Sequence, residues 1–331
     1  MGRDEETVAE TASGPGAGRG GDPAAPGAGR GGDPADVGAG GGRDASDAGL
    51  THREGTFAGA EDLEIYWQGW RAEAPARAVV VIAHGVSEHG GRYAHLAERL
   101  AVAGYPAWAL DHRGHGRSEG RRAVIDRMDN AASDLDAFIG IAAAPDPEVP
   151  LVLLGHSMGG CLSLHYALGD PSRLDALVLS APAATLRSAS SAQRLAGRAL
   201  SAIAPGFGVF EVDAELISSD PAAVEAYVAD PLVHHGRLPA RTVAEIAAAI
   251  EAFPDRLPTL ALPLHGLHGS EDRLVPVEAS RTVNRLAGSE DKTLDVYQGL
   301  RHEVFNERPE DRERVIGDLI AWLDARFAPA G

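Results

Sequence analysis

Two serines of the chain stand in the pattern Gly-x-Ser-x-Gly, which can lift a serine hydroxyl onto a sharp turn between a strand and a helix. One pattern is centred on Ser118 and the other on Ser157. Ser157 directly follows the apolar run 151–154 and precedes an apolar helical segment, whereas Ser118 follows the polar run 111–115. Strand, turn and helix therefore surround only the second serine. We predict Ser157 as a catalytic nucleophile and Ser118 as a loop residue.

A serine nucleophile needs a general base at neutral pH, and the base needs a carboxylate that orients it. In proteins with this kind of turn, the chain order is serine, acid, histidine. Asp272 and His302 follow the last two apolar strand segments in that order, and we predict them as the acid and the base. Glu271 is the alternative acid. His265 and His268 lie in or beside a strand and are expected to be packed or hydrogen-bonded residues.

The developing oxyanion needs two amide donors near the nucleophile. The Met158 amide follows Ser157 at the start of a helix, where the backbone N–H groups and the helix dipole favour negative charge. The second donor should come from the loop after an early strand, and Val86 occupies that place. His84 is expected to brace this loop. The single cysteine, Cys161, is expected to pack as a small apolar residue.

These residues require strands that end at one edge of a sheet. Apolar runs predict a hairpin over 51–72 and strands over 78–83, 107–110, 151–154, 174–179, 260–267 and 293–297. Helical spacing of apolar residues is found over 93–103, 131–142, from 162 onward, and over 312–327. Buried strands that alternate with helices predict an α/β fold with a mostly parallel, doubly wound sheet.

The segment 185–256 interrupts this alternation. It contains helical pieces over 193–203 and 243–252, separated by Pro205, Gly206, Gly208 and Pro221. Long connections without a purpose are uncommon. We therefore predict a cap inserted into a core formed by 51–184 and 257–331, with a single long crossover as the alternative.

Residues 1–50 consist mostly of Gly, Ala, Pro, Asp and Arg, and the ten residues 15–24 recur unchanged at 26–35. Such a segment cannot bury enough apolar surface to offset the entropy of ordering it. We expect a disordered, glycine-rich tail.

The charge and cysteine content limit the classes of partner. The formal net charge is −18, with 48 acidic and 30 basic residues, which disfavours nucleic acid and strong attraction to anionic lipid. One cysteine excludes an intramolecular disulfide, and Asn306 stands where an H-E-x-x-H metal motif beginning at His302 would need histidine. We expect no metal and no cofactor.

Without a signal sequence or an apolar run long enough to span a bilayer, the expected location is cytoplasmic, with peripheral contact at membranes allowed.

Several separated motifs resemble the monoacylglycerol lipases. Residues 84–93 resemble their H-G-x-x-E-H-x-x-R-Y box, residues 111–118 their D-x-x-G-H-G-x-S stretch, and residues 155–160 their G-H-S-M-G-G. Residues 230–236, 269–272 and 302–307 resemble the bacterial branch, so the similarity covers about 55–327. The resemblance implies an α/β-hydrolase fold with a helical cap. It also implies an enzyme that hydrolyses monoacylglycerols to glycerol and fatty acid through an acyl-enzyme, without a cofactor.

The resemblance leaves the substrate pocket open. Glu88 and Arg92 either receive the glycerol group or brace the oxyanion loop. Apolar residues of the expected cap, with Phe207 and Phe210 among them, either line a tunnel for one acyl chain and touch the lipid interface, or form the cap's own core. A lysophospholipase or general carboxylesterase with the same triad is the alternative enzyme. A non-catalytic binding protein on the same fold is a remote alternative.

Overall fold

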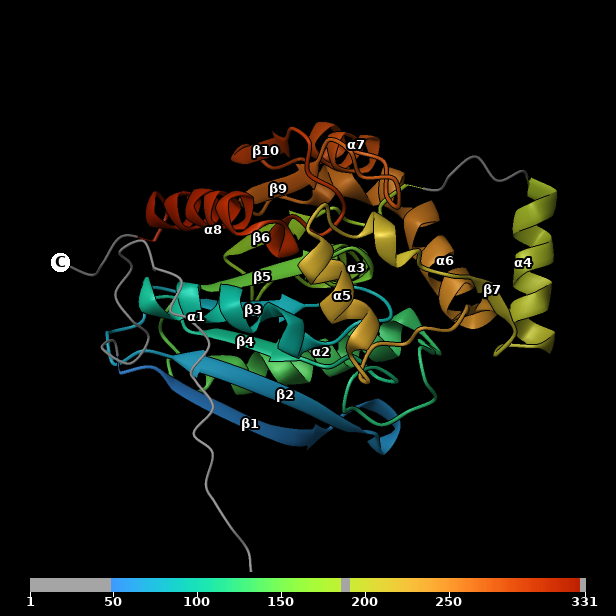
Figure 1. Cartoon of the computed structure of the whole chain (residues 1–331), viewed down its shortest axis with the longest axis horizontal. Helices are drawn as coiled ribbons and strands as arrows, with labels where there is room; N and C mark the ends of the chain where they lie inside the picture. The colour runs from blue at the N-terminus through green and yellow to red at the C-terminus, as the bar shows by residue number, and fades with distance from the viewer. Residues whose placement is uncertain (1–48, 186–190, 328–331) are drawn as a thin grey trace, which may run out of the picture. The chain divides into compact units, whose positions relative to one another are not determined.

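An eight-stranded sheet runs through the described part of the chain, which in this computed structural model comprises residues 49–185 and 191–327 (Figure 1). The predicted tail therefore lies outside the described residues, apart from Gly49 and Leu50. Leu50 packs against the core. None of the helices within the described ranges combines the length and the hydropathy of a membrane span.

The strand order is β1-β2-β4-β3-β5-β6-β9-β10, and β7 pairs with β8 in a separate two-stranded sheet. The strands are β1 (Thr51–Ala58), β2 (Glu64–Arg71), β3 (Val79–Ala83), β4 (Ala107–Leu110), β5 (Leu151–His156), β6 (Ala176–Ser180), β7 (Gly208–Phe210), β8 (Leu238–Pro239), β9 (Leu264–Gly269) and β10 (Lys292–Tyr297). The hairpin of β1 and β2 is antiparallel, and β2 also pairs antiparallel with β4. All other neighbours in the large sheet are parallel, which confirms the predicted, mostly parallel sheet.

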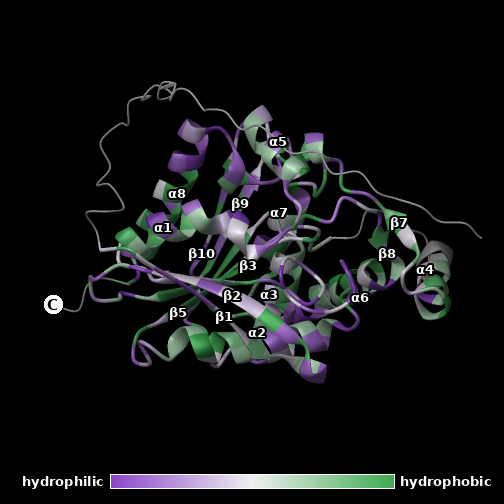
Figure 2. Ribbon diagram, turned by 60° about the horizontal axis from the view of Figure 1, so that its bottom comes forward, coloured by the Kyte–Doolittle hydropathy of each residue, from purple (hydrophilic) through white to green (hydrophobic). Residues whose placement is uncertain are grey.

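The central strands are apolar along their whole length because helices cover both faces of the sheet. In β3, alternate residues point to opposite faces: Val79 and Val81 join one core, and Val80 and Ile82 join the other. The first core includes residues of α2 and α3, and the second includes residues of α1 and α8. Figure 2 shows this arrangement as hydrophobic strands lying between helices with mixed faces. The sheet is therefore doubly wound.

The helices agree with most of the predicted ones. They are α1 (Ala94–Val102), α2 (Met128–Ala143), α3 (Met158–Gly169), α4 (Ser191–Ile203), α5 (Pro221–Ala229), α6 (Ala240–Arg256), α7 (Glu278–Leu286) and α8 (Pro309–Asp324). Short 3-10 helices are η1 (Ala60–Asp62), η2 (Gly90–Tyr93), η3 (Ala214–Leu216), η4 (Leu257–Thr259) and η5 (Val304–Asn306). Helices α5 and α7 were not predicted. We expected Pro221 to separate helices, but it is the first residue of α5, where its missing N–H has no cost and Asp220 caps the helix.

The chain between β6 and β9 forms an insertion that contains α4, β7, α5, β8 and α6. We call it the β6–β9 insertion. Helix α6 packs against α2 and α3, and its residues Ile250 and Phe253 are buried in the main core. Helix α4 packs against α6 and lies on its outer side (Figure 1). The insertion therefore reaches from the main core to the periphery of the described part.

A buried ion cluster connects α2 to the loop after β4 and to the turn of the β1–β2 hairpin. The Arg113 side chain is only 1% exposed and donates to both carboxylate oxygens of Asp134, at 2.7 and 2.9 Å. It also donates to Asp126 at 2.8 Å and to the carbonyl of Ala60 at 3.0 Å. Asp134 in turn accepts from the Ala60 amide at 2.7 Å. Three segments that are distant in sequence are thus held by one buried charge pair.

We predict that Asp134→Ala destabilises the protein by about 3–5 kcal/mol, because it leaves a buried guanidinium with too few acceptors. The control is Asp146→Ala, which removes the partner of Arg71 in a partly exposed pair and should cost under about 1 kcal/mol. Denaturant unfolding at pH 7 measures both losses. Equal, small losses in the two variants would show that the buried cluster does not hold these segments together.

Candidate active site

Ser157 lies on a strained turn between β5 and α3. Its backbone φ is 51° and its ψ is −114°, a left-handed conformation that a residue with a side chain rarely adopts. A Cβ at Gly155 would collide with Ser163 and Gly159, and a Cβ at Gly159 would collide with the carbonyls of Ala83 and His84. The two glycines therefore allow the turn to close against the end of β3.

Asp272 and His302 come together from the loops after β9 and β10, two parallel neighbouring strands. His302 Nδ1 donates to Asp272 Oδ2 at 2.6 Å. The other oxygen, Oδ1, accepts the amides of Leu274 at 2.8 Å and Val275 at 2.9 Å. The Asp272 side chain is fully buried. Its carboxylate is thus fixed from both sides, and one oxygen orients the imidazole.

Burial alone would raise the pKa of Asp272. The charge of His302 and the hydrogen bonds at the two carboxylate oxygens lower the pKa by more than burial raises it, so the pKa lies well below the usual range. His268 contributes to this lowering, with Nε2 at 3.1 Å from Asp272 Oδ2. From the sequence we expected His268 to be a packed or hydrogen-bonded residue, without naming its partner. Its spacing of four residues from Asp272 is the sequence signal that could have indicated this contact.

His302 experiences opposing effects. Burial lowers its pKa, but the charge of Asp272 and the hydrogen bond to it raise the pKa more, and the charges of Glu303 and Glu88 add to the rise. The pKa of His302 therefore lies above the ordinary value for histidine. The neighbouring His156, whose ring centroid lies 4.7 Å from that of His302, has its pKa lowered to about 3 by burial and by His302.

The alternative residues are engaged elsewhere or exposed. The Ser118 hydroxyl donates to the Asp111 carbonyl at 2.5 Å and accepts from the Tyr66 amide at 2.9 Å, so it joins a loop to a strand. Glu271 is exposed. Cys161 is fully buried in the core, and burial raises the pKa of its thiol.

A small pocket opens at Ser157 and His302. Its volume is about 100 Å³. It is lined by Gly85, Val86, Glu88, His156, Ser157, Phe210, Val212, Ile217, Tyr227, Leu274, Val275, His302 and Glu303. Four of these residues, Phe210, Val212, Ile217 and Tyr227, come from the β6–β9 insertion. The insertion therefore covers the serine, and much of the lining is apolar.

The two predicted pocket phenylalanines differ in position. Phe210 lines the pocket and is also 49% exposed, so it stands where the pocket meets the surface. Phe207 is 57% exposed and is not among the lining residues.

Glu88 holds the loop that carries Val86. One carboxylate oxygen accepts from the Gly85 amide at 2.6 Å and from the Tyr93 hydroxyl at 2.8 Å. The other accepts from Arg92 at 2.6 Å. Both oxygens of this buried carboxylate are thus occupied by protein groups.

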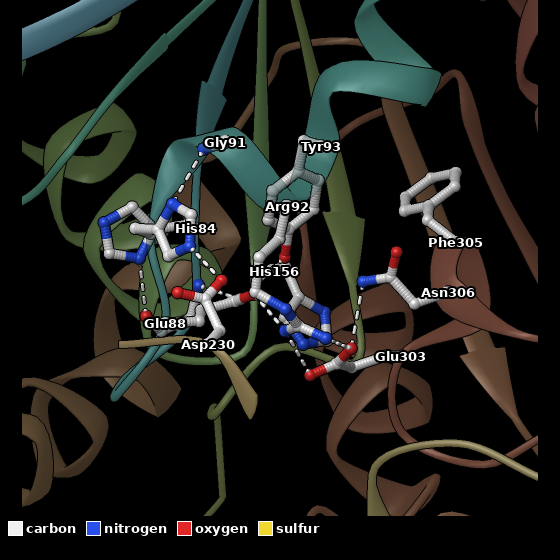
Figure 3. Close-up of polar contacts among 12 residues, drawn as sticks. His84, Glu88, Gly91, Arg92, Tyr93, His156, Asp230, Glu303, Phe305 and Asn306 are labelled. Carbon is white, nitrogen blue, oxygen red and sulfur yellow. Dashed lines mark hydrogen bonds and ion pairs between the residues drawn. The ribbon is translucent and has the colours of Figure 1, made fainter. Parts of the chain in front are cut away.

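Arg92 extends this network to the loop of the predicted base. Its guanidinium also donates to both oxygens of Glu303 at 2.8 and 2.7 Å (Figure 3). The same guanidinium lies 4.8 Å from the ring centre of Tyr227 on α5. Burial raises the pKa of Glu303, but the charge and hydrogen bonds of Arg92 lower it more. We did not predict a role for Glu303 from the sequence. Its position directly after His302 is the only sequence feature that could have indicated one.

His84 lies at the start of the same loop. Its Nδ1 donates to the Gly85 carbonyl at 2.7 Å, and its Nε2 accepts from the His112 amide at 2.9 Å. Both ring nitrogens are therefore engaged with backbone groups, as a bracing residue requires.

Comparisons with known proteins show the family of the chain. Residues 74–309 match the family described as "Serine aminopeptidase, S33". The chain is 42% identical to a monoacylglycerol lipase of Mycolicibacterium smegmatis over 82% of this chain and 97% of the relative. It is 32% identical to a monoglyceride lipase of Rattus norvegicus over 82% of this chain and 90% of the relative.

A solved structure, the monoacylglycerol lipase of Paleococcus ferrophilus, superimposes with a TM-score of 0.69 at 29% identity, covering 83% of this chain and 99% of that one. The α/β-hydrolase fold is thereby confirmed. Since nearly the full length of these relatives is matched, the chain belongs to the monoacylglycerol lipase family of the α/β-hydrolases.

Proposed function

We propose that the protein hydrolyses monoacylglycerols to glycerol and a free fatty acid, through an acyl-enzyme on Ser157. The observation that carries the proposal is the strained turn of Ser157, which lines the same pocket as His302, the partner of Asp272. The names of the full-length relatives supply the substrate class.

The reaction proceeds in two balanced steps. His302 Nε2 accepts the proton of Ser157 as the oxygen attacks the ester carbonyl, and the protonated imidazole then gives that proton to the departing glycerol oxygen. Water repeats the sequence on the acyl-enzyme and releases the fatty acid. Asp272 stabilises the imidazolium and fixes the tautomer that leaves Nε2 free.

The Val86 and Met158 amides form the oxyanion hole in this proposal. Met158 is the first residue of α3, so its N–H is one of the helix-terminal donors that have no partner within the helix. Glu88 supports the other donor by holding Gly85 one residue earlier. Occupied carboxylate oxygens favour bracing, rather than glycerol binding, as the role of Glu88 and Arg92.

The pocket favours a single acyl chain. Its volume of about 100 Å³ is well below the roughly 300–1,000 Å³ of typical ligand pockets. A long acyl chain must therefore continue past Phe210 toward the surface. Each methylene removed from water contributes roughly 0.8 kcal/mol, which favours medium and long chains over acetate.

We further propose that the β6–β9 insertion, predicted as residues 185–256, acts as a cap that touches the lipid interface. The large apolar side chains that stand exposed in the described part of the chain are Ile203, Phe207, Phe210 and Val228, and all four lie in the insertion. Exposed apolar residues concentrated on one element are typical of an interaction surface. The cap would then deliver a lipid ester to the pocket mouth at Phe210.

We predict that a fluorophosphonate probe labels Ser157, and that alanine at Ser157, Asp272 or His302 lowers turnover by about three orders of magnitude or more, non-additively. Ser118→Ala should keep the labelling and Glu271→Ala the activity, since both side chains lie outside the pair described above. Labelling that persists in Ser157→Ala would reject the nucleophile. If Asp272→Ala were active and Glu271→Ala inactive, the catalytic acid would be Glu271 and not Asp272.

The acid limb of the pH profile should have its midpoint above about 6.5, the ordinary histidine value. Catalysis needs neutral His302, and a raised pKa means that protonation already removes the base at a higher pH. Asp272→Asn removes the main cause of the rise, so the limb of the residual kcat/KM should move to lower pH. A midpoint below that of free histidine in the native protein would contradict the proposed base.

Substrate choice is tested with mono-, di- and triacylglycerols and a lysophospholipid that carry the same acyl chain, presented at matched interface. We expect kcat/KM to be highest for the monoacylglycerol, because the pocket leaves no room for a second chain. Equal rates on all glycerides would indicate a general carboxylesterase instead. A higher rate on the lysophospholipid would indicate a lysophospholipase.

Substitutions of the two phenylalanines distinguish the role of the pocket from the role of the proposed lipid interface. Phe210→Ser should lower kcat/KM for a medium-chain monoacylglycerol both in true solution and in an emulsion, because Phe210 lines the pocket. Phe207→Ser should lower the rate only in the emulsion. Loss of the solution rate in Phe207→Ser would contradict this division.

A further inference from the structure

The exposed apolar residues between α4 and β7 form the outer end of the cap. Ile203 is 84% exposed, Phe207 57% and Phe210 49%, and we call these three residues the cap tip. In both ribbon views, α4 and β7 lie on the side of the described part that is away from β10 and α8 (Figures 1 and 2).

Two arginines flank the cap tip. The guanidinium of Arg121 lies against Gly206, and the side chain of Arg237 lies against Gly208, one residue on either side of Phe207. Both arginines are exposed. Within the described ranges, neither guanidinium has an ion-pair or hydrogen-bond partner. Their charges are therefore available to an external anion.

The sequence segments that contain Phe207 and Arg237 are poor in acidic residues. Residues 196–210 and 231–242 contain neither Asp nor Glu, and Glu211 is the first acid after Phe210. Arg122, beside Arg121, is also exposed and donates to the carbonyls of Gly116 and Leu232 rather than to an acid. In a chain with 48 acidic and 30 basic residues, the segments that carry Phe207 and Arg237 are thus free of acidic residues up to the exposed Glu211.

We propose that the cap tip docks on an anionic lipid surface, with Arg121 and Arg237 contacting headgroup phosphates while Phe207 and Ile203 enter the acyl boundary. This inference rests on the proposed lipase function and specifies the surface on which the enzyme works. Apolar anchoring and cationic contact together are the usual requirements of interfacial binding. At physiological salt, charges more than about 8 Å from the membrane are largely screened. The local arginines then outweigh the net charge of −18, from which we had expected little attraction to anionic lipid.

The test measures vesicle binding by flotation of the full chain carrying Ser157→Ala, so that turnover does not alter the lipid. The vesicles contain phosphatidylcholine alone or mixed with phosphatidylglycerol in equal amounts. We expect binding at least about tenfold tighter to the anionic vesicles, and a preference that weakens as salt is added.

The double variant Arg121→Gln/Arg237→Gln should lose most of this preference. Each substitution should weaken the affinity for the anionic vesicles about fivefold. The matched control is Arg53→Gln/Arg285→Gln, which changes the net charge equally at exposed sites on β1 and α7 and should bind like the parent. Equal binding of the parent to both vesicles, or equal loss in both double variants, would overturn the inference.

A second readout separates this inference from the proposed function. With Ser157 restored, hydrolysis of a dissolved short-chain monoacylglycerol should be the same in the parent and in both double variants. Hydrolysis without vesicle preference would reject the anionic surface and leave the lipase standing. Vesicle preference without monoacylglycerol hydrolysis would do the reverse.

Discussion

The buried ion triple Glu88–Arg92–Glu303 joins the parts of the site that no strand holds together. Glu88 fixes the loop at Gly85, Glu303 follows the predicted base, and Arg92 binds both carboxylates and lies against Tyr227 of the insertion. Such a triple is costly to desolvate, and removing one member would leave charges buried without partners. The loop carrying Val86, the loop carrying the predicted base and α5 are therefore held in one arrangement around the pocket at Ser157.

The insertion gives this site its environment. The hydrogen bond from the Glu303 amide to the Ile217 carbonyl attaches it to the loop of His302, and Phe210 carries its apolar surface from the pocket to the solvent. The same stretch of chain thus shapes the small pocket and carries the exposed Ile203 and Phe207. The pocket is therefore continuous with the surface that we propose as the lipid interface, as a lipase whose substrate resides in a lipid phase requires.

Features set by local sequence were predictable, and features set by distant contacts were not. The apolar runs and the turn at Ser157 are local, and they led to the parallel sheet. Helix α5 was missed because Pro221 is a break inside a helix but a favourable first residue. Glu303 escaped notice because its partner Arg92 is 211 residues away. Phe207 and Phe210 look alike in sequence and both are exposed, but only Phe210 also lines the pocket, a difference that depends on the fold of the insertion.

The central claim is that a monoacylglycerol acylates Ser157 in a pocket that admits one chain. The most direct measurement is rapid acid quenching of the protein mixed with a monoacylglycerol, followed by mass spectrometry of its peptides. The account predicts one acyl group on the peptide containing Ser157, and less of it from the diacylglycerol with the same acyl chain. An acyl group on Ser118 or on any other residue, or equal acylation by the two glycerides, would contradict it.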